Sequence, residues 1–239
     1  MESINLNDSL AIRNLKKEYL LKKEKISSRL NEFDGFYSGN YSWHFYDNKM
    51  ELKENSNDAD FSLFEELCFC ILTANTSAEM GMRSIDKIRN LLINGSAEEM
   101  SRALEGTYRF NNLRPAFIVH TREQFKRSYN FKLKENIESL KNDPDILRDF
   151  FVDNVKGFGY KEASHFLRNI GFKGYAILDK HILNSLIEFG VVDEIKMPLN
   201  RDRYLGIEGK MKVFSNEIGI PMDELDLLLW SRRNGRILK

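Results

Sequence analysis

Lys161 is the residue whose position offers the most specific chemistry in this sequence. It follows the segment Val155–Tyr160, in which Phe158 stands between two glycines and a helical pattern begins at once. Glycine allows positive φ and a close approach of backbone, so this segment predicts a tight hairpin between two helices. Lys161 then falls in the first turn of the second helix, where the positive end of the helix dipole favours an uncharged amine. An uncharged amine is the form that a nucleophilic or Schiff-base lysine requires.

Two interpretations of this hairpin are open from the pattern alone. Unpaired N–H groups at the start of the second helix can bind an anion such as a DNA phosphate. The stretch 156–173 supports this interpretation, because it holds four basic residues against one acidic residue. The alternative is an ordinary helix–helix corner that carries a solvated surface lysine, since Gly-x-Gly is a common sequence.

Asp179 is the second candidate catalytic residue, and it lies eighteen residues after Lys161. This single carboxylate follows an apolar run, Tyr175–Leu178, and stands at the start of another predicted helix. Aspartate is a good helix N-cap, which is the simpler interpretation. A partly buried carboxylate that faces a lysine could also take its proton or stabilise a cationic sugar. The two roles are compatible with each other.

Outside these motifs, most of the chain has the apolar spacing of helices. The length of 239 residues allows one large domain or two small ones, and low contents of Gly (14) and Pro (4) disfavour a β-sandwich. Aromatic and turn residues in 35–52 indicate a short N-terminal β-hairpin. The expected fold class is therefore all-α with this hairpin attached. The predicted helices span residues 9–30, 61–74, 77–94, 97–105, 114–129, 132–140, 145–156, 161–170, 180–189, 199–217 and 221–230.

Charge is balanced over the whole chain, with 36 basic and 36 acidic side chains, so a nucleic-acid role has to rest on local charge. Residues 108–134 hold seven basic side chains against one acidic side chain, which suits a DNA contact. Residues 47–66 hold seven acidic side chains against two basic ones, and we expect them to face away from DNA.

The sequence predicts neither a metal site nor a membrane span. The four histidines are scattered, and Cys68 and Cys70 lie two positions apart in an apolar run, on opposite sides of a helix. These cysteines are expected to be buried hydrophobic residues. No apolar run approaches the ~18 residues of a membrane helix, and the N-terminus lacks a signal-peptide pattern. We expect an intracellular protein, cytoplasmic or associated with the nucleoid, and a monomer.

The hairpin Val155–Lys161, followed by Asp179 within Ile177–Ile182, resembles the helix-hairpin-helix-Gly/Pro-Asp superfamily of DNA glycosylases. More closely, the chain resembles the small archaeal-type 8-oxoguanine DNA glycosylase/AP lyases over residues 61–239. Three further segments carry the closer resemblance: Glu66–Asn75, Lys161–Asn169, and Glu224–Trp230 with the C-terminal Gly235–Lys239. The superfamily branch with a four-cysteine cluster is excluded, because the chain has two cysteines.

This resemblance implies catalytic roles for Lys161 and Asp179. Lys161 matches the lysine that attacks the sugar C1′, displaces the damaged base and forms a Schiff base that permits β-elimination. Asp179 matches the catalytic aspartate. The residues expected to contact DNA are Asn75, which would enter the space left by the flipped nucleotide, and Lys156, Gly157, Phe158 and Gly159 of the hairpin. A monovalent cation often binds at this hairpin in relatives, and the chemistry needs no other cofactor.

The same resemblance implies a pocket for the base. Phe110 and Trp230 match the aromatic residues that sandwich the flipped base, and the terminal carboxylate of Lys239 matches a group that contacts it. A flipped base needs a stacking platform and polar groups that read its edges. Because 8-oxoguanine carries a proton on N7 where guanine has an acceptor, an acceptor on the protein would discriminate between them. The simpler interpretations are a core aromatic for Trp230 and a frayed tail for the C-terminus.

The resulting hypothesis is a base excision repair enzyme that removes 8-oxoguanine from double-stranded DNA and then cleaves the abasic site. The resemblance implies two helical lobes, residues 61–174 with the hairpin at the cleft and residues 1–60 with 175–239, so that Lys161 and Asp179 meet at their junction. Two alternatives stay open: a glycosylase of the same fold for another lesion, such as an oxidised pyrimidine, and a non-catalytic helix-hairpin-helix DNA-binding module.

Overall fold

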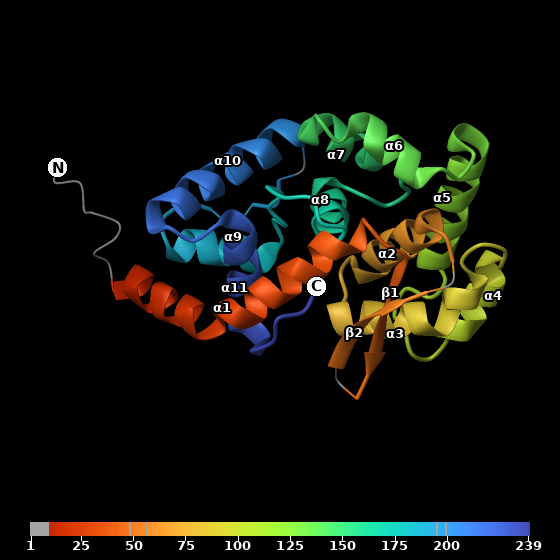
Figure 1. Ribbon diagram of the computed structural model, residues 1–239, viewed down its shortest axis with the longest axis horizontal. Coiled ribbons are helices and arrows are strands. Elements are labelled where there is room, and N and C mark those ends of the chain that lie inside the picture. The colour runs from red at the N-terminus through yellow and green to blue at the C-terminus, as the bar shows by residue number, and fades with distance from the viewer. Residues whose placement is uncertain (1–9, 48, 56, 195, 199) are drawn as a thin grey trace. The chain divides into compact units, whose positions relative to one another are not determined.

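The computed structural model describes residues 10–47, 49–55, 57–194, 196–198 and 200–239, and it is built from helices and one two-stranded sheet (Figure 1). This architecture confirms the predicted all-α class with a β-hairpin. The elements in chain order are α1 (Leu10–Phe36), β1 (Tyr41–Tyr46), β2 (Lys49–Glu54), α2 (Ala59–Thr73), α3 (Ala78–Ile88), the 3-10 helix η2 (Arg89–Leu91), α4 (Ala97–Leu104), α5 (Arg114–Tyr129), α6 (Leu133–Leu140), α7 (Pro144–Asn154), α8 (Tyr160–Asn169), α9 (Lys180–Glu188), α10 (Arg201–Ile218) and α11 (Met222–Asn234).

The chain divides into two compact units. Unit 1 contains the described residues up to Asp34 together with Gly171–Lys239, and unit 2 contains Gly35–Ile170. The resemblance led us to expect divisions at residues 60/61 and 174/175. The largest difference concerns the β-hairpin, which clusters with unit 2 because its first strand packs on α2 and α3.

Helix α2 forms the centre of unit 2. Its residues from Ser62 to Thr73 are all buried, and it packs against α3, α5, α6 and α8. A continuous apolar run, rather than a one-sided stripe, is what a helix covered on every side requires. Cys68 and Cys70 are free thiols inside this helix, as predicted, and burial raises the pKa of the Cys68 thiol.

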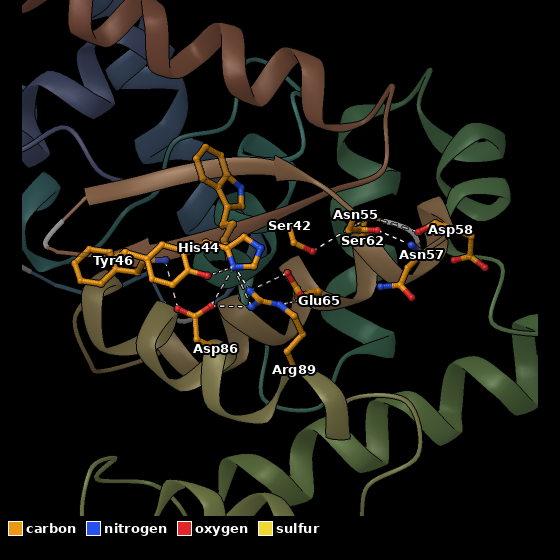
Figure 2. A network of polar contacts seen from close by, with 12 residues as sticks. Ser42, His44, Tyr46, Asn55, Asn57, Asp58, Ser62, Glu65, Asp86 and Arg89 are labelled. Atoms are coloured by element: carbon orange, nitrogen blue, oxygen red, sulfur yellow. Dashed lines mark hydrogen bonds and ion pairs between the residues drawn. The ribbon is translucent and has the colours of Figure 1, made fainter.

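Arg89 attaches the β-hairpin to the helices of unit 2 (Figure 2). Its guanidinium donates to Glu65 Oε2 on α2 at 2.7 Å, to Asp86 Oδ1 on α3 at 2.8 Å and to the carbonyl of Trp43 on β1 at 2.6 Å. Burial and the charge of Arg89 lower the pKa of His44 on the same strand, so its neutral ring can accept from Arg89 Nη1 at 3.3 Å. One half-buried cation thus joins the hairpin to two helices.

Unit 1 contains α1, α9, α10 and α11. Helix α1 buries the stripe Ile12, Leu15, Tyr19, Ile26, Leu30 and Phe33. Three polar contacts tie this helix to α11: the Tyr19 hydroxyl donates to Glu224, Lys22 Nζ donates to Ser231 Oγ at 3.0 Å, and Glu18 pairs with Arg232 at 3.4 Å. Helix α11 also packs on α9 and α10. In the described part of the chain, no helix combines the length and the apolar character that a bilayer crossing needs.

We expect the substitution Arg89→Met to lower the free energy of unfolding by about 3 kcal/mol, because it leaves the buried Glu65 carboxylate without its cation. Denaturant unfolding followed by circular dichroism measures this loss. Lys132→Met is the matched control, since Lys132 pairs with Glu135 on the exposed surface and should change the midpoint little. Equal midpoints for the two variants would show that Arg89 does not hold the hairpin.

Candidate active-site residues

The predicted hairpin joins α7 to α8 in unit 2. Its turn is closed by Phe158 N–H, which donates to the carbonyl of Val155 at 3.1 Å. Gly157 has a φ of +87°, and a Cβ at this position would lie 2.5 Å from Cδ2 of Phe117 and 3.2 Å from Nη1 of Arg114. Both the backbone conformation and the lack of space therefore require glycine here. The hairpin backbone rests directly on α5.

The residues on either side of Gly157 set the start of α8. Gly159 is its N-cap, and its N–H donates to Glu162 Oε2 at 3.2 Å. The N–H of Lys156 donates to Thr121 Oγ1 on α5 at 3.1 Å, a bond that a proline at this position could not make. The side chain of Lys156 is exposed, and that of Phe158 is half-buried.

Lys161 lies in the first turn of α8, as predicted. Its side chain is 21% exposed, and Nζ lies 3.7 Å from Oε1 of Glu162. The side chain is therefore neither sealed in the core nor fully exposed to solvent.

Behind Lys161, α8 is held by buried polar contacts. Every residue from Ala163 to Asn169 is buried. Asn169 Nδ2 donates to Glu66 Oε1 on α2 at 2.6 Å, and Arg148 Nη1 on α7 donates to Ser164 Oγ at 3.2 Å. The first of these bonds joins the two segments, Glu66–Asn75 and Lys161–Asn169, whose sequences carried the resemblance.

Asn75 and Phe110 lie on turns of the same unit. Asn75 is exposed between α2 and α3 with a φ of +61°, a conformation that asparagine tolerates better than most residues. Phe110 is half-buried in the turn before α5. Arg114 reaches both turns, because it donates to the carbonyl of Ala74 at 3.4 Å and lies over the Phe110 ring at 5.6 Å.

Two arginines of the basic run 108–134 are buried, which corrects our interpretation of the whole run as a surface for DNA. Arg114 and Arg122 are 7% and 6% exposed. Arg122 Nη1 donates to the carbonyl groups of Leu92 and Gly95, at 3.1 and 2.8 Å. These guanidinium groups satisfy backbone carbonyls in the core. The only sequence signal for burial was their spacing with the apolar residues of α5.

In unit 1, Asp179 is the N-cap of α9, as its position predicted. Oδ1 accepts from the N–H groups of His181 at 2.8 Å and Ile182 at 2.9 Å. Oδ2 accepts from Nε1 of Trp230 on α11 at 2.9 Å. Both oxygens are thus engaged by donors, and the Trp230 ring is bonded to the carboxylate rather than packed only as a core aromatic.

Side chains of α10 and α11 hold the extended segment that leads to Asp179. The Ala176 N–H donates to Glu208 Oε1 at 2.8 Å, and the Ile177 N–H donates to Asp226 Oδ1 at 3.2 Å. The Tyr204 hydroxyl accepts from the Leu178 N–H at 3.2 Å. Since no strand pairs with this segment in the described residues, these bonds satisfy its buried backbone.

Lys239, the last residue of the sequence, is 6% exposed. The C-terminal residue is therefore buried, and not frayed as the simpler interpretation held.

Comparison with known proteins places this arrangement in a family. A family model described as 8-oxoguanine DNA glycosylase matches residues 46–220. The 8-oxoguanine DNA glycosylase/AP lyase of Methanocaldococcus jannaschii is 42% identical over 191 residues, which cover 80% of this chain and 89% of that relative. This chain belongs to the 8-oxoguanine DNA glycosylase family. The resemblance drawn from the hairpin is confirmed.

Other members of the family agree in length and fold. The 8-oxoguanine DNA glycosylase/AP lyase of Fusobacterium nucleatum is 39% identical over 223 residues, which cover 90% of this chain and all of that relative. A crystal structure of the Methanocaldococcus jannaschii glycosylase/lyase, in complex with a 15mer DNA containing 8-oxoguanine, matches with a TM-score of 0.78 and 36% identity. It covers 95% of this chain and all of the solved chain.

The candidate residues of this glycosylase family member are distributed over both units. Unit 2 holds Lys161, the hairpin residues, Asn75 and Phe110, whereas unit 1 holds Asp179, Trp230 and Lys239. Within unit 1 the structure joins Asp179 to Trp230 directly. Among the described residues, no cluster of three or more His, Cys, Asp or Glu side chains could hold a metal ion. The roles of the individual residues stay predictions.

We expect Asp179→Asn to fold with its cap intact, because asparagine caps a helix as well as aspartate, and to lose about 100-fold or more in turnover. In this variant an NH2 group, which can only donate, replaces one of the two carboxylate oxygens. One of the three N–H groups that now donate to Asp179 would therefore lose its acceptor. Single-turnover cleavage of an 8-oxoguanine duplex and the thermal midpoint are the two measurements.

Asp143→Asn is the matched control. Asp143 caps α7 through the N–H groups of Asp145 and Ile146, at 3.1 and 3.0 Å, and has no proposed part in the chemistry. An Asp179→Asn protein that melts early but keeps its activity per folded molecule would reduce Asp179 to a cap.

Proposed function

We propose that this protein excises 8-oxoguanine from duplex DNA and then cleaves the abasic site through a lysine Schiff base. The observation that carries the proposal is the position of Lys161, half-buried in the first turn of a helix that starts at the Gly157 hairpin. Relatives named 8-oxoguanine DNA glycosylase/AP lyase, which match 74–96% of this chain, support it.

Lys161 is the proposed nucleophile. Its neutral amine attacks C1′ of the damaged nucleotide, and the electron pair of the glycosidic bond leaves with the base, which takes up a proton. Opening of the sugar then gives an iminium ion between Nζ and C1′. Loss of a proton from C2′ breaks the bond from C3′ to the 3′ phosphate oxygen, which is the lyase step.

Asp179 is the proposed partner of the developing positive charge on the sugar. Three donors fix its orientation: the two α9 N–H groups and Trp230 Nε1. A preorganised carboxylate stabilises a cation more than a mobile one, because it does not have to reorient as charge develops.

The hairpin and the Asn75 turn are the proposed DNA contacts. Lys156 and Gly157 are exposed, so the hairpin can offer a cation and backbone groups to a phosphate. Carbonyl oxygens at the same exposed residues could hold a monovalent cation, whose part would be to bind phosphate. We propose no organic cofactor.

The base would be recognised by Phe110, Trp230 and the terminal carboxylate of Lys239. Two aromatic rings supply stacking that does not depend on which base is present. A carboxylate supplies the acceptor that N7–H of 8-oxoguanine satisfies and the N7 lone pair of guanine does not. We further propose that the protein works as a monomer inside the cell, on chromosomal DNA.

Borohydride reduction should trap a covalent complex between the protein and an 8-oxoguanine duplex, and Lys161→Gln should abolish it, because the amide cannot form an imine. Gel electrophoresis of the denatured products measures the trap. Lys141→Gln, a change at an exposed lysine paired with Glu138, is the matched control and should trap normally. Trapping that survives in Lys161→Gln would assign the nucleophile to another residue.

One extra residue after Lys239 should weaken selection of 8-oxoguanine over guanine by about tenfold, the loss expected for an interaction of about 1.4 kcal/mol. The physical reason is that the added peptide bond removes the terminal carboxylate from the base. Cleavage of a ready-made abasic site by the same protein is the internal control and should not change. Unaltered selectivity, or a preference for oxidised pyrimidines across a panel of lesions, would contradict this account of base recognition.

A further inference from the structure

Arg114 is a buried cation in an unfavourable place. It is the first residue of α5, where the positive end of the helix dipole opposes a positive charge, and its side chain is 7% exposed. Its Nε has no hydrogen-bond partner in the described structure. Burying a charge with incomplete hydrogen bonding is costly, so a contribution elsewhere has to offset the cost.

The contacts of Arg114 connect Phe110 to the hairpin. The guanidinium lies 5.6 Å from the centre of the Phe110 ring and 5.3 Å from the centre of the Phe117 ring. Phe117 in turn supports Gly157, where a Cβ would lie 2.5 Å from the ring. We call this series, Phe110 to Arg114 to Phe117 to Gly157, the Arg114 contact chain. All of it lies within unit 2.

A hydrogen bond from Nη2 to the carbonyl of Ala74, the residue before Asn75, holds the arginine in this chain. The neighbouring Tyr108 is fixed as well, because its hydroxyl donates to the carbonyl of Leu72 at 2.7 Å. A planar guanidinium can stack on rings while it donates in its own plane, and an ammonium group cannot.

We propose that Arg114 is a positioning residue, which sets the place of Phe110 relative to the Gly157 hairpin through the Arg114 contact chain. This inference rests on the proposed function, in which Phe110 stacks on the flipped base and the hairpin precedes Lys161. Arg109 also lies over Phe110, at 5.0 Å, but it is exposed, so a base can displace it while the buried Arg114 stays.

The two steps of the reaction separate this role from a general effect on folding. Base excision needs Phe110 in place, because the base has to be stacked as it leaves. Cleavage of a ready-made abasic site needs Lys161 and the hairpin, but there is no base to stack. Arg114 Nη1 also lies beside Gly157, but the Phe117 ring is the nearer neighbour and stays in place when Arg114 is replaced. A positioning defect should therefore slow the first step and spare the second.

The test compares Arg114→Met and Arg114→Lys with the wild type on both substrates under single-turnover conditions. We expect excision of 8-oxoguanine to fall by about tenfold or more in both variants, a change of about 1.4 kcal/mol in the barrier. Abasic-site cleavage should stay within about threefold of the wild type. Arg114→Lys keeps the charge with a smaller change in packing, so it covers the case in which Arg114→Met folds poorly.

Three further variants complete the experiment. Arg122→Met removes a buried arginine of the same helix, which bonds to Glu123 and to the carbonyl groups of Leu92 and Gly95 rather than to the hairpin. It should spare both steps in the folded protein. Gly157→Ala, which pushes the hairpin off Phe117, should slow both. Phe110→Ala combined with Arg114→Met should be no slower in excision than Phe110→Ala alone, because the two residues act through one contact.

A parallel loss of both steps in the Arg114 variants, or full additivity with Phe110→Ala, would overturn the inference. A wild-type protein without either activity would instead overturn the proposed function. The two failures are therefore distinguishable.

Discussion

The contact between Gly157 and the Phe117 ring is the constraint on which the candidate active site of unit 2 depends. It is possible because Gly157 has no side chain and a φ of +87°, and it brings the hairpin backbone onto α5. Thr121 strengthens the same contact by accepting the Lys156 N–H. Arg114, Phe117 and Thr121 are spaced three and four residues apart, so they share one face of α5. That face is the platform on which the turn before Lys161 is built.

The rigidity of this platform comes from buried polar groups as well as from apolar packing. Glu66 accepts from Asn169, and Arg148 donates to Ser164, so the helix that carries Lys161 is hydrogen-bonded to both α2 and α7. Hydrogen bonds to charged groups such as these contribute about 1.5–3 kcal/mol of net stability each, and leaving a buried partner unsatisfied is costly. They therefore favour one position of α8 over slightly shifted alternatives, which matters for a nucleophile that has to reach one carbon atom.

In unit 1, a single carboxylate fixes the position of the candidate site residues. Asp179 caps α9 through one oxygen and accepts from Trp230 through the other. The group proposed to stabilise the sugar and the ring proposed to stack on the base are thereby fixed to each other. Glu208, Asp226 and Tyr204 hold the segment before it, where a strand partner would do so in a sheet. Positioning in this unit thus relies on side chains that satisfy backbone groups.

Local patterns in the sequence were sufficient for the helices, the β-hairpin, the Gly157 turn and the Asp179 cap, because each depends on residues within a few positions of one another. The family followed from short motifs at Lys161, Asp179 and the C-terminus. Only the tertiary structure decided that Arg114 and Arg122 are buried, that Arg89 attaches the β-hairpin to unit 2, and that Trp230 bonds to Asp179. The physical reason is that a charged residue in a helix has the same local pattern whether it meets water or a carbonyl group from a distant segment. Its partner is set by how the helices pack, and periodicity does not contain that information.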